Sequence, residues 1–265
     1  MVMDEDESDQ IGDGPRDRPP EEIEPSELRG ALFRLQLLGD DPYLRMQVFN
    51  LALVDPFLTQ LERQLLEAYH QEERTPIPEA AFLSALSQMW IFATYEIMRT
   101  WRQRANDILK WAENSGLEIK LQALKKDVGY QHIGRQFRAK QIEGVLADPS
   151  TIERIREDLR RTHMLFARLE AIRVSIAKHE VKGRKNSVAL RPGYGRINDW
   201  SGSLDYELEN GAYSMGYTSR RDIADEIRSL LMPGPPPADE VLAQFDAYMR
   251  GPTSELLDSD SSRSS

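Results

Sequence analysis

The sequence predicts a mainly α-helical protein, a helical bundle with a small C-terminal β-hairpin and helix appendage. Two observations favour this fold class. Apolar residues recur at spacings of three, four and seven through most of residues 28–182, which is the period of helices that bury one face. Short alternating segments separated by a turn signal occur only after residue 203, and they are typical of a single hairpin.

The composition divides the 265 residues into four parts. Residues 1–27 and 251–265 hold few apolar residues, so they cannot bury enough surface to offset the entropy of ordering. We therefore expect a disordered acidic arm at 1–27 and a disordered tail at 251–265. Between them we expect a helical bundle domain at 28–182, followed by a basic loop, the hairpin and C-terminal helices at 183–250.

The first long helix should begin after Asp40 or Asp41, either of which can cap it with Pro42 in the first turn. Pro56 should kink or break this helix because proline lacks a backbone donor. The apolar positions of the segment are Leu44, Val48, Leu51, Phe57, Leu61, Leu65 and Leu66. Further helices are expected at residues 79–114, 118–127 and 135–146, with Asn114-Ser-Gly116 as the stop signal of the first of these.

The most regular apolar pattern predicts a helix at residues 151–181. Ser150 and Glu153 have the spacing of a capping box at its start. The basic, glycine-rich residues 182–203 should form a loop. The remaining expected elements are strands at 203–208 and 212–217 joined by Glu-Asn-Gly, a helix capped by Thr218 or Ser219 that runs to Leu231, a stiff spacer at 233–237 and a last helix at 239–249.

Charge is distributed unevenly along the chain. The formal net charge is −10, yet residues 120–196 hold eighteen bases and eight acids. This basic middle part is a possible footprint for a polyanion, and the alternative is a solvated, arginine-rich helix face. The candidate nucleic-acid-binding residues are Lys178, Lys182, Arg184, Lys185, Arg191 and Arg196.

Several kinds of chemistry are excluded by residues that the sequence lacks. There is no cysteine, so disulfides, thiolate metal sites and a cysteine nucleophile are ruled out. No glycine-rich phosphate loop, zinc-binding His-Glu-x-x-His or nucleophile elbow is present. We therefore expect no metal and no cofactor. No apolar run is long enough to span a bilayer and the N-terminus is acidic, so we expect a cytoplasmic protein that does not bind membranes.

Arg173 and His179 form the strongest candidate for catalysis. They lie six residues apart, so on a helix they are separated by about 9 Å along the axis, a gap that a long arginine can span. Histidine suits proton transfer near neutral pH, and the planar fork of arginine matches the oxygens of a phosphate. The alternative is a histidine favoured by the helix dipole and an arginine that extends from the edge of the core.

A second cluster holds Glu96, between Tyr95 and Arg99 on the helix predicted at 79–114. Glu96 could orient Arg173 or His179 if the two long helices pack together. It could equally form a surface ion pair with Arg99 at a spacing of three. Arg220 and Arg221 open the later helix and could bind an anion at its N-terminus, with a simple exposed capping turn as the alternative.

The helical pattern, the Arg173-x5-His179 spacing and Tyr95-Glu-x-x-Arg99 together resemble the HEPN superfamily over residues 80–182. The resemblance implies a metal-independent endoribonuclease, often a toxin or defence protein, that acts as a homodimer whose two motifs meet at a shared cleft. It assigns catalysis to Arg173 and His179, with Glu96 as support, and implies RNA and an antitoxin or other protein as partners. Val174 follows the arginine where the family usually has a polar residue. The alternative function is a non-catalytic helical module that binds a protein partner or nucleic acid.

Overall fold

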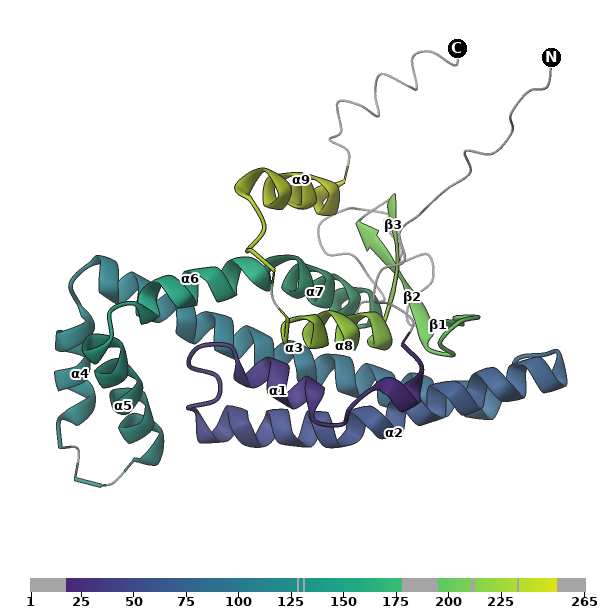
Figure 1. The fold of residues 1–265 in the computed structure, drawn as a ribbon, viewed down its shortest axis with the longest axis horizontal. Helices are drawn as coiled ribbons and strands as arrows, with labels where there is room; N and C mark the ends of the chain where they lie inside the picture. The colour runs from purple at the N-terminus through teal and green to yellow at the C-terminus, as the bar shows by residue number, and fades with distance from the viewer. Residues whose placement is uncertain are drawn as a thin grey trace, which may run out of the picture.

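A computed structural model gives the fold and describes residues 18–127, 129–130, 132–177, 195–210, 213–232 and 234–251. Within these residues the chain forms nine α-helices and one antiparallel sheet with the strand order β1-β2-β3 (Figure 1). The predicted fold class is therefore confirmed. No helix in the described part is long and apolar enough to cross a membrane. The elements are the 3-10 helix η2 (Pro20–Glu22), the helices α1 (Glu27–Phe33), α2 (Pro42–Glu72), α3 (Ile77–Glu113), α4 (Leu117–Lys125), α5 (Ile133–Ala147), α6 (Thr151–Arg161), α7 (His163–Ala177), α8 (Arg220–Ser229) and α9 (Asp239–Arg250), and the strands β1 (Gly195–Ile197), β2 (Leu204–Asn210) and β3 (Tyr213–Ser219).

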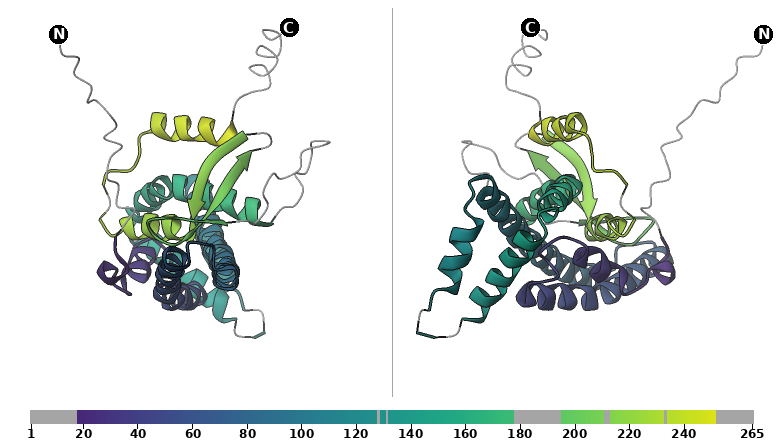
Figure 2. Two further views of the ribbon diagram at one scale, coloured as in Figure 1. Left: turned by 90° about the vertical axis from the view of Figure 1, so that its right-hand side faces the viewer. Right: turned by 60° about the vertical axis from the view of Figure 1, so that its left-hand side comes forward.

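The long hairpin of α2 and α3 is the base of the molecule, and the later elements pack on it. Helix α7 packs against α3, strand β2 packs against α7, and α8 packs against α1. Trp90, Met98 and Trp101 of α3 are buried in the main core, which draws on α1, α2, α7, α8 and β2. A second core lies where α4, α5 and α6 meet the end of α3, at one end of the bundle (Figures 1 and 2).

Local capping signals in the sequence fix several helix ends as predicted. The Asp41 carboxylate accepts hydrogen bonds from the backbone N–H groups of Tyr43 and Leu44, so it caps α2. Ser219 and Asp222 form the expected capping box at the start of α8. Helix α3 ends at Glu113, one residue before the predicted Asn114-Ser-Gly116 stop.

Three predictions about helices are wrong. The predicted break at Pro56 does not occur: α2 continues from Pro42 to Glu72, and Asp55, Leu58 and Thr59 next to the proline are buried. The predicted helix at 151–181 is divided at Thr162 into α6 and α7. Ser150 makes no capping bond, because its backbone is already helical and its hydroxyl donates to Asp148 instead (2.5 Å).

Two segments predicted to be irregular have regular structure in part. Within the predicted arm, residues 20–22 form η2 and Arg18 pairs with Glu27 (2.5 Å), so the predicted disorder does not extend to these residues. Within the predicted loop at 182–203, β1 pairs antiparallel with β2. This third strand was missed because three residues carry too little alternation to register as a strand.

The turn after β1 fixes the sheet against α2. Gly202 has φ +71°, and a Cβ at this position would lie 2.0 Å from the carbonyl oxygen of Glu62. Only glycine permits both this backbone conformation and so close an approach.

Candidate functional site

Arg173 lies near the end of α7 and packs on a tyrosine of α3. Its guanidinium carbon is 4.4 Å from the centroid of the Tyr95 ring, within the range of a cation–π contact. The Arg173 Nε is buried and has no hydrogen-bond partner among the described residues. The prediction that Arg173 interrupts the apolar stripe is wrong, because the buried stripe of α7 is the unbroken series Leu165, Leu169, Ile172 and Ile176. Arg173 is half-buried at the edge of this stripe, as in the alternative of an arginine that extends from the edge of the core.

The contact between Arg173 and Tyr95 is one end of a four-membered column. The Tyr95 ring stacks on Phe166 with 5.7 Å between centroids, and the guanidinium of Arg102 lies 4.6 Å from the centroid of Phe166. The two residues from each helix are seven positions apart, which places them on one face of that helix. The column therefore joins α3 to the antiparallel α7 with an arginine at each end.

The hydroxyl of Tyr95 is 3.4 Å from the Glu170 carboxylate, to which it donates. Burial and the charge of Glu170 raise the pKa of this hydroxyl, while Arg173 opposes the shift. Tyr95 therefore remains protonated near neutral pH. It can position Arg173 through its ring and can donate a proton in a hydrogen bond, but it is not a general base.

Glu96 belongs to a different cluster. Its carboxylate accepts from Arg99 on the same helix (2.7 Å), and both side chains are about half exposed. No ion pair joins it to Arg173 among the described residues. The surface ion pair predicted as the alternative is thus the observed arrangement, because Glu96 and Tyr95 are adjacent in sequence and point in directions about 100° apart on α3.

Most of the other predicted site residues lie outside the described part of the chain. These are His179, Lys178, Lys182, Arg184, Lys185 and Arg191. Arg196 is described: it is exposed on β1 and its guanidinium lies 5.4 Å from the centroid of Tyr217. The structure therefore neither joins nor separates Arg173 and His179.

Both expectations for Arg220 and Arg221, a simple exposed capping turn and a site that binds an anion, are wrong about the exposure of these side chains. Both are buried at the start of α8, where Arg220 donates to Glu62 (2.6 Å) and Asp55 (2.5 Å) of α2. Burial acts to lower the pKa of Arg220, but the carboxylates of Glu62 and Asp55 raise it overall. Arg221 and Arg228 complete this network by pairing with Asp225. The arginines are already neutralised by carboxylates of the same chain.

An exposed apolar surface on α2 was missed by the sequence reasoning. We define the outer α2 face as Tyr43, Met46, Phe49, Asn50, Leu53, Val54 and Phe57. Its six apolar members are between 42% and 68% exposed, and Asn50 is exposed among them. The signal in the sequence was the apolar character of this segment on every side of the helix, whereas a surface helix normally has one polar side.

No charged side chain of α2 itself belongs to the outer α2 face, although Arg29 of α1 lies against it, 5.9 Å from the centroid of the Phe49 ring. Between Tyr43 and Phe57 the charged residues of α2 are Arg45 and Asp55. Arg45 lies over the Phe33 ring at 5.6 Å, and Asp55 is buried in the network with α8. Helix α2, which carries this face, lies below α3 in Figure 1.

A groove between α2 and α3 continues the outer α2 face. Its cavity of about 460 Å³ is lined by Gln47, Asn50, Leu51, Val54, Leu86, Met89, Trp90, Ala93, Glu96 and Ile97. Met89 is 66% exposed and Phe82, one helical turn before Leu86, is 54% exposed. Glu96 is the one acidic residue of this lining and is neutralised by Arg99. The groove is therefore apolar with a polar edge, the composition of a site for apolar ligands or side chains.

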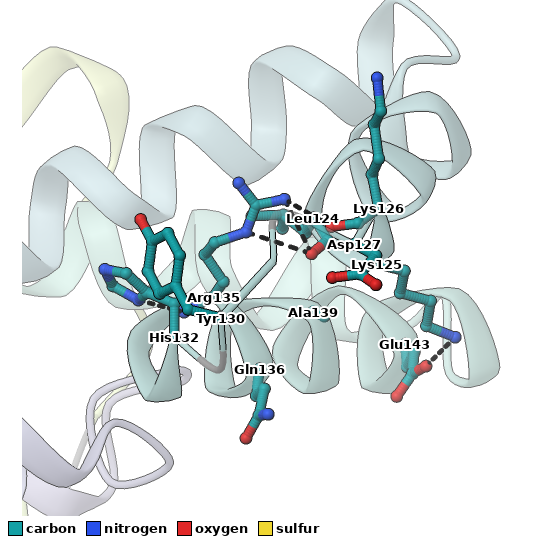
Figure 3. Close-up of a pocket in the computed structure, with 10 residues that line it drawn as sticks. All are labelled: Leu124, Lys125, Lys126, Asp127, Tyr130, His132, Arg135, Gln136, Ala139 and Glu143. Atoms are coloured by element: carbon teal, nitrogen blue, oxygen red, sulfur yellow. Dashed lines mark hydrogen bonds and ion pairs between the residues drawn. The ribbon is translucent and has the colours of Figure 1, made fainter.

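A second cavity, of about 420 Å³, lies between α4 and α5, and several of its polar groups are already engaged (Figure 3). Arg135 donates to the carbonyls of Ala123 (2.7 Å) and Leu124 (3.1 Å), which satisfies acceptors at the end of α4. His132 accepts the backbone N–H of Arg135 and caps α5, and Lys125 pairs with Glu143. This cavity is a by-product of helix capping.

No group of His, Asp or Glu side chains in the described ranges could hold a metal ion. Comparisons of the chain with protein-family models, with curated proteins and with solved structures found no match.

Proposed function

We propose that this chain is a helical module that binds a protein partner through the outer α2 face. The observation that carries the proposal is the exposure of six large apolar side chains on one uncharged side of α2. In a chain in which 29% of the residues are charged, such a surface is disfavoured unless something covers it. Contiguous apolar patches of this kind mark interaction surfaces on monomeric proteins.

The groove between α2 and α3 supports the same proposal. It lies beside the outer α2 face and shares Asn50 and Val54 with it, so a partner that covers the face also reaches the groove. Such a groove fits a side chain or a helix edge that projects from the partner, as in helix-in-groove recognition.

Site-specific photo-crosslinking tests the proposal. A benzophenone amino acid in place of Leu53 should give one or more adducts of defined mass in the native cells of the protein. The matched control places the same group at Gln64, which is exposed on α2 two to three turns further along. Equal labelling at both positions, or no adduct at either, would contradict a binding role for the outer α2 face.

A second candidate function is the metal-independent endoribonuclease implied by the HEPN resemblance, and Arg173 specifically supports it. Its Nε lacks a partner among the described residues while Tyr95 holds the guanidinium near the end of α7. In this proposal Arg173 binds the phosphate, His179 transfers the proton, and Lys178, Lys182 and the basic residues that follow hold RNA. Glu96 is not assigned a role, because it pairs with Arg99.

Cleavage of labelled RNA in EDTA tests the nuclease proposal. His179→Ala should abolish cleavage without changing helicity, and Arg173→Lys should reduce it strongly because lysine cannot match phosphate oxygens bidentately. Arg99→Lys is the matched control on α3 and should leave cleavage unchanged. Full activity of the His179→Ala variant, or activity that depends on Mg²⁺, would exclude this function.

A further inference from the structure

We infer that the partner of the outer α2 face is a second copy of this chain, with the two α2 helices antiparallel about a two-fold axis at Asn50. The inference rests on the proposed binding role of this face and names its occupant. Three independent properties of the face support it: its symmetry, its central amide and its lack of carboxylates.

The first property is the spacing of the residues on the face. Tyr43, Asn50 and Phe57 are seven positions apart, so they lie on one line along the helix over about 21 Å. A two-fold axis at Asn50 exchanges Tyr43 of one copy with Phe57 of the other. It likewise sets Met46 opposite Val54. Apolar side chains then face one another on both sides of Asn50, while Leu53 comes level with Gln47 of the other copy. The same patch is used by both subunits, as an isologous interface requires.

The second property is the position of an amide in the middle of an apolar line. The Asn50 side chain makes no hydrogen bond to any residue that the structure describes. An amide carries both a donor and an acceptor, so two Asn50 side chains related by a two-fold axis satisfy each other. A purely apolar partner would leave the amide buried and unsatisfied. A single buried asparagine in a helical seam is a known device for fixing register.

The third property is that no residue of the outer α2 face is a carboxylate; the charge beside it is Arg29 of α1, whose guanidinium carbon lies 5.9 Å from the centroid of the Phe49 ring. Two chains of net charge −10 repel each other at long range, and the outer α2 face adds no negative charge to that repulsion. Association should therefore strengthen as salt screens the repulsion. A complex held by complementary charges would respond in the opposite direction.

The exposed area is sufficient for a stable dimer. The six apolar residues of the outer α2 face are about half exposed, and large side chains of this kind expose about 100 Å² each at that fraction. Together they offer about 600 Å², and Phe82 and Met89 at the groove raise this to about 800 Å², the usual contribution of one partner to a specific interface.

Sedimentation and cysteine cross-linking of the purified full chain test the inference. The wild type should sediment near 61 kDa, twice the 30.4 kDa of one chain, and Leu53→Asp should sediment as a monomer with unchanged helicity. The chain has no cysteine, so Asn50→Cys should form a disulfide-linked dimer on oxidation. Gln64→Cys, the matched control on the same helix, should not.

The direction of the helices is tested by mixing two variants. Met46→Cys mixed with Val54→Cys should give the mixed disulfide in preference to either self-linked product, whereas parallel helices would favour self-linked products. The inference is overturned if the wild type is monomeric at about 100 µM. It is also overturned if a dimer survives Leu53→Asp while Asn50→Cys remains unlinked. A benzophenone adduct at position 53 with a mass other than twice that of the chain would support the proposed binding role and reject the second copy as its occupant.

Discussion

The two sides of helix α2 depart from the usual arrangement of a surface helix at several positions. Among its buried leucines the inward side carries Asp55 and Glu62, which are 2% and 0% exposed, while the outward side carries Leu53 and Phe57, which are 68% and 51% exposed. The difference follows from what faces each side. The inward carboxylates meet arginines of α8, whereas the described chain leaves half or more of the Leu53 and Phe57 side chains uncovered. Burial in this molecule thus depends on the available partner as well as on hydrophobicity.

The inward network can be buried because its charges balance. Three arginines of α8 and three carboxylates of α2 and α8 form it, and their side chains are at most 7% exposed. The desolvation of each charge is offset only while its partners remain in place. The network is therefore a poor source of net stability but a strong requirement for the docking of α8 on α2.

The largest effect is expected from breaking this network. Arg220→Met should lower the free energy of unfolding by about 3–5 kcal/mol, because it leaves Glu62 and Asp55 buried with fewer compensating charges. Urea denaturation followed by circular dichroism measures the change. The surface variant Arg63→Ala, which removes the exposed pair with Glu67, should cost at most about 1 kcal/mol.

A second substitution distinguishes the lost charge from lost packing. If the cost arises from an uncompensated carboxylate, Glu62→Gln should partly restore the stability of Arg220→Met. Two results would show that uncompensated charge is not the cause. One is a loss of unfolding free energy in Arg220→Met no larger than in the Arg63→Ala control. The other is a double variant whose loss equals the sum of the losses of the two single variants.

The next effect tests how tightly the inward side of α2 is packed. Gly202→Ala should lower the free energy of unfolding by about 3 kcal/mol, because the backbone has φ +71° and the added Cβ would meet the Glu62 carbonyl oxygen. Thermal unfolding of the pure protein gives the measurement. Gly144→Ala is the control, since nothing lies within 4 Å of its added Cβ, and an equal cost at both positions would refute the close approach.

Local signals in the sequence identified most of the helices and several of their ends. Asp41 and Ser219 cap helices as predicted, because a cap depends on residues within one turn. The break at Thr162 was not predictable in this way. There Arg102 of α3 donates to the Leu159 carbonyl (3.3 Å), a contact between residues 57 positions apart.

The residues of the candidate site show the same difference between features set by nearby sequence and features set by distant contacts. The place of Arg173 at the edge of the core and the pairing of Glu96 with Arg99 follow from helical periodicity, and each was stated as an alternative. The burial of Arg220 was not, because it depends on carboxylates more than 150 residues earlier in the chain. The outer α2 face was missed because the periodicity of Leu44, Val48 and Leu51 predicts only the buried side of the helix. It does not predict whether the opposite side is polar or apolar.

A smaller effect is expected on the outward side of α2. Leu53→Gln should change the free energy of unfolding of the monomer by less than about 0.5 kcal/mol, because the side chain is already 68% exposed. It should, however, abolish the dependence of the melting temperature on protein concentration that a dimer shows. Calorimetry at several concentrations separates the two results, and a large loss of monomer stability would show that this side is packed against the chain itself.

The smallest effect concerns Asp158, a half-buried carboxylate that forms no ion pair among the described residues, unlike Asp55. Asp158 accepts the backbone N–H of Gln36 (2.8 Å), and burial raises the pKa of its carboxyl group. The folded protein thus holds this proton more strongly than the unfolded chain does. Stability from Asp158 falls as the pH rises from about 3.9, the ordinary carboxyl pKa, through the raised value. Asp158→Asn keeps an acceptor for Gln36 and should gain relative stability between pH 4 and pH 7.

Asp148 is the matched control because its shift has the opposite sign. Hydrogen bonds from Ser150 and Arg154 lower the pKa of this exposed carboxyl group to about 2, so its contribution is present above pH 3.9 and is lost as the pH falls toward 2. Asp148→Asn should therefore be less stable than the wild type at pH 7, and the difference should shrink at acidic pH. Urea denaturation across this range gives the difference in free energy of unfolding between each variant and the wild type. As the pH rises, this difference should change in favour of Asp158→Asn and against Asp148→Asn. Changes of the same sign would contradict the opposite pKa shifts of the two carboxyl groups.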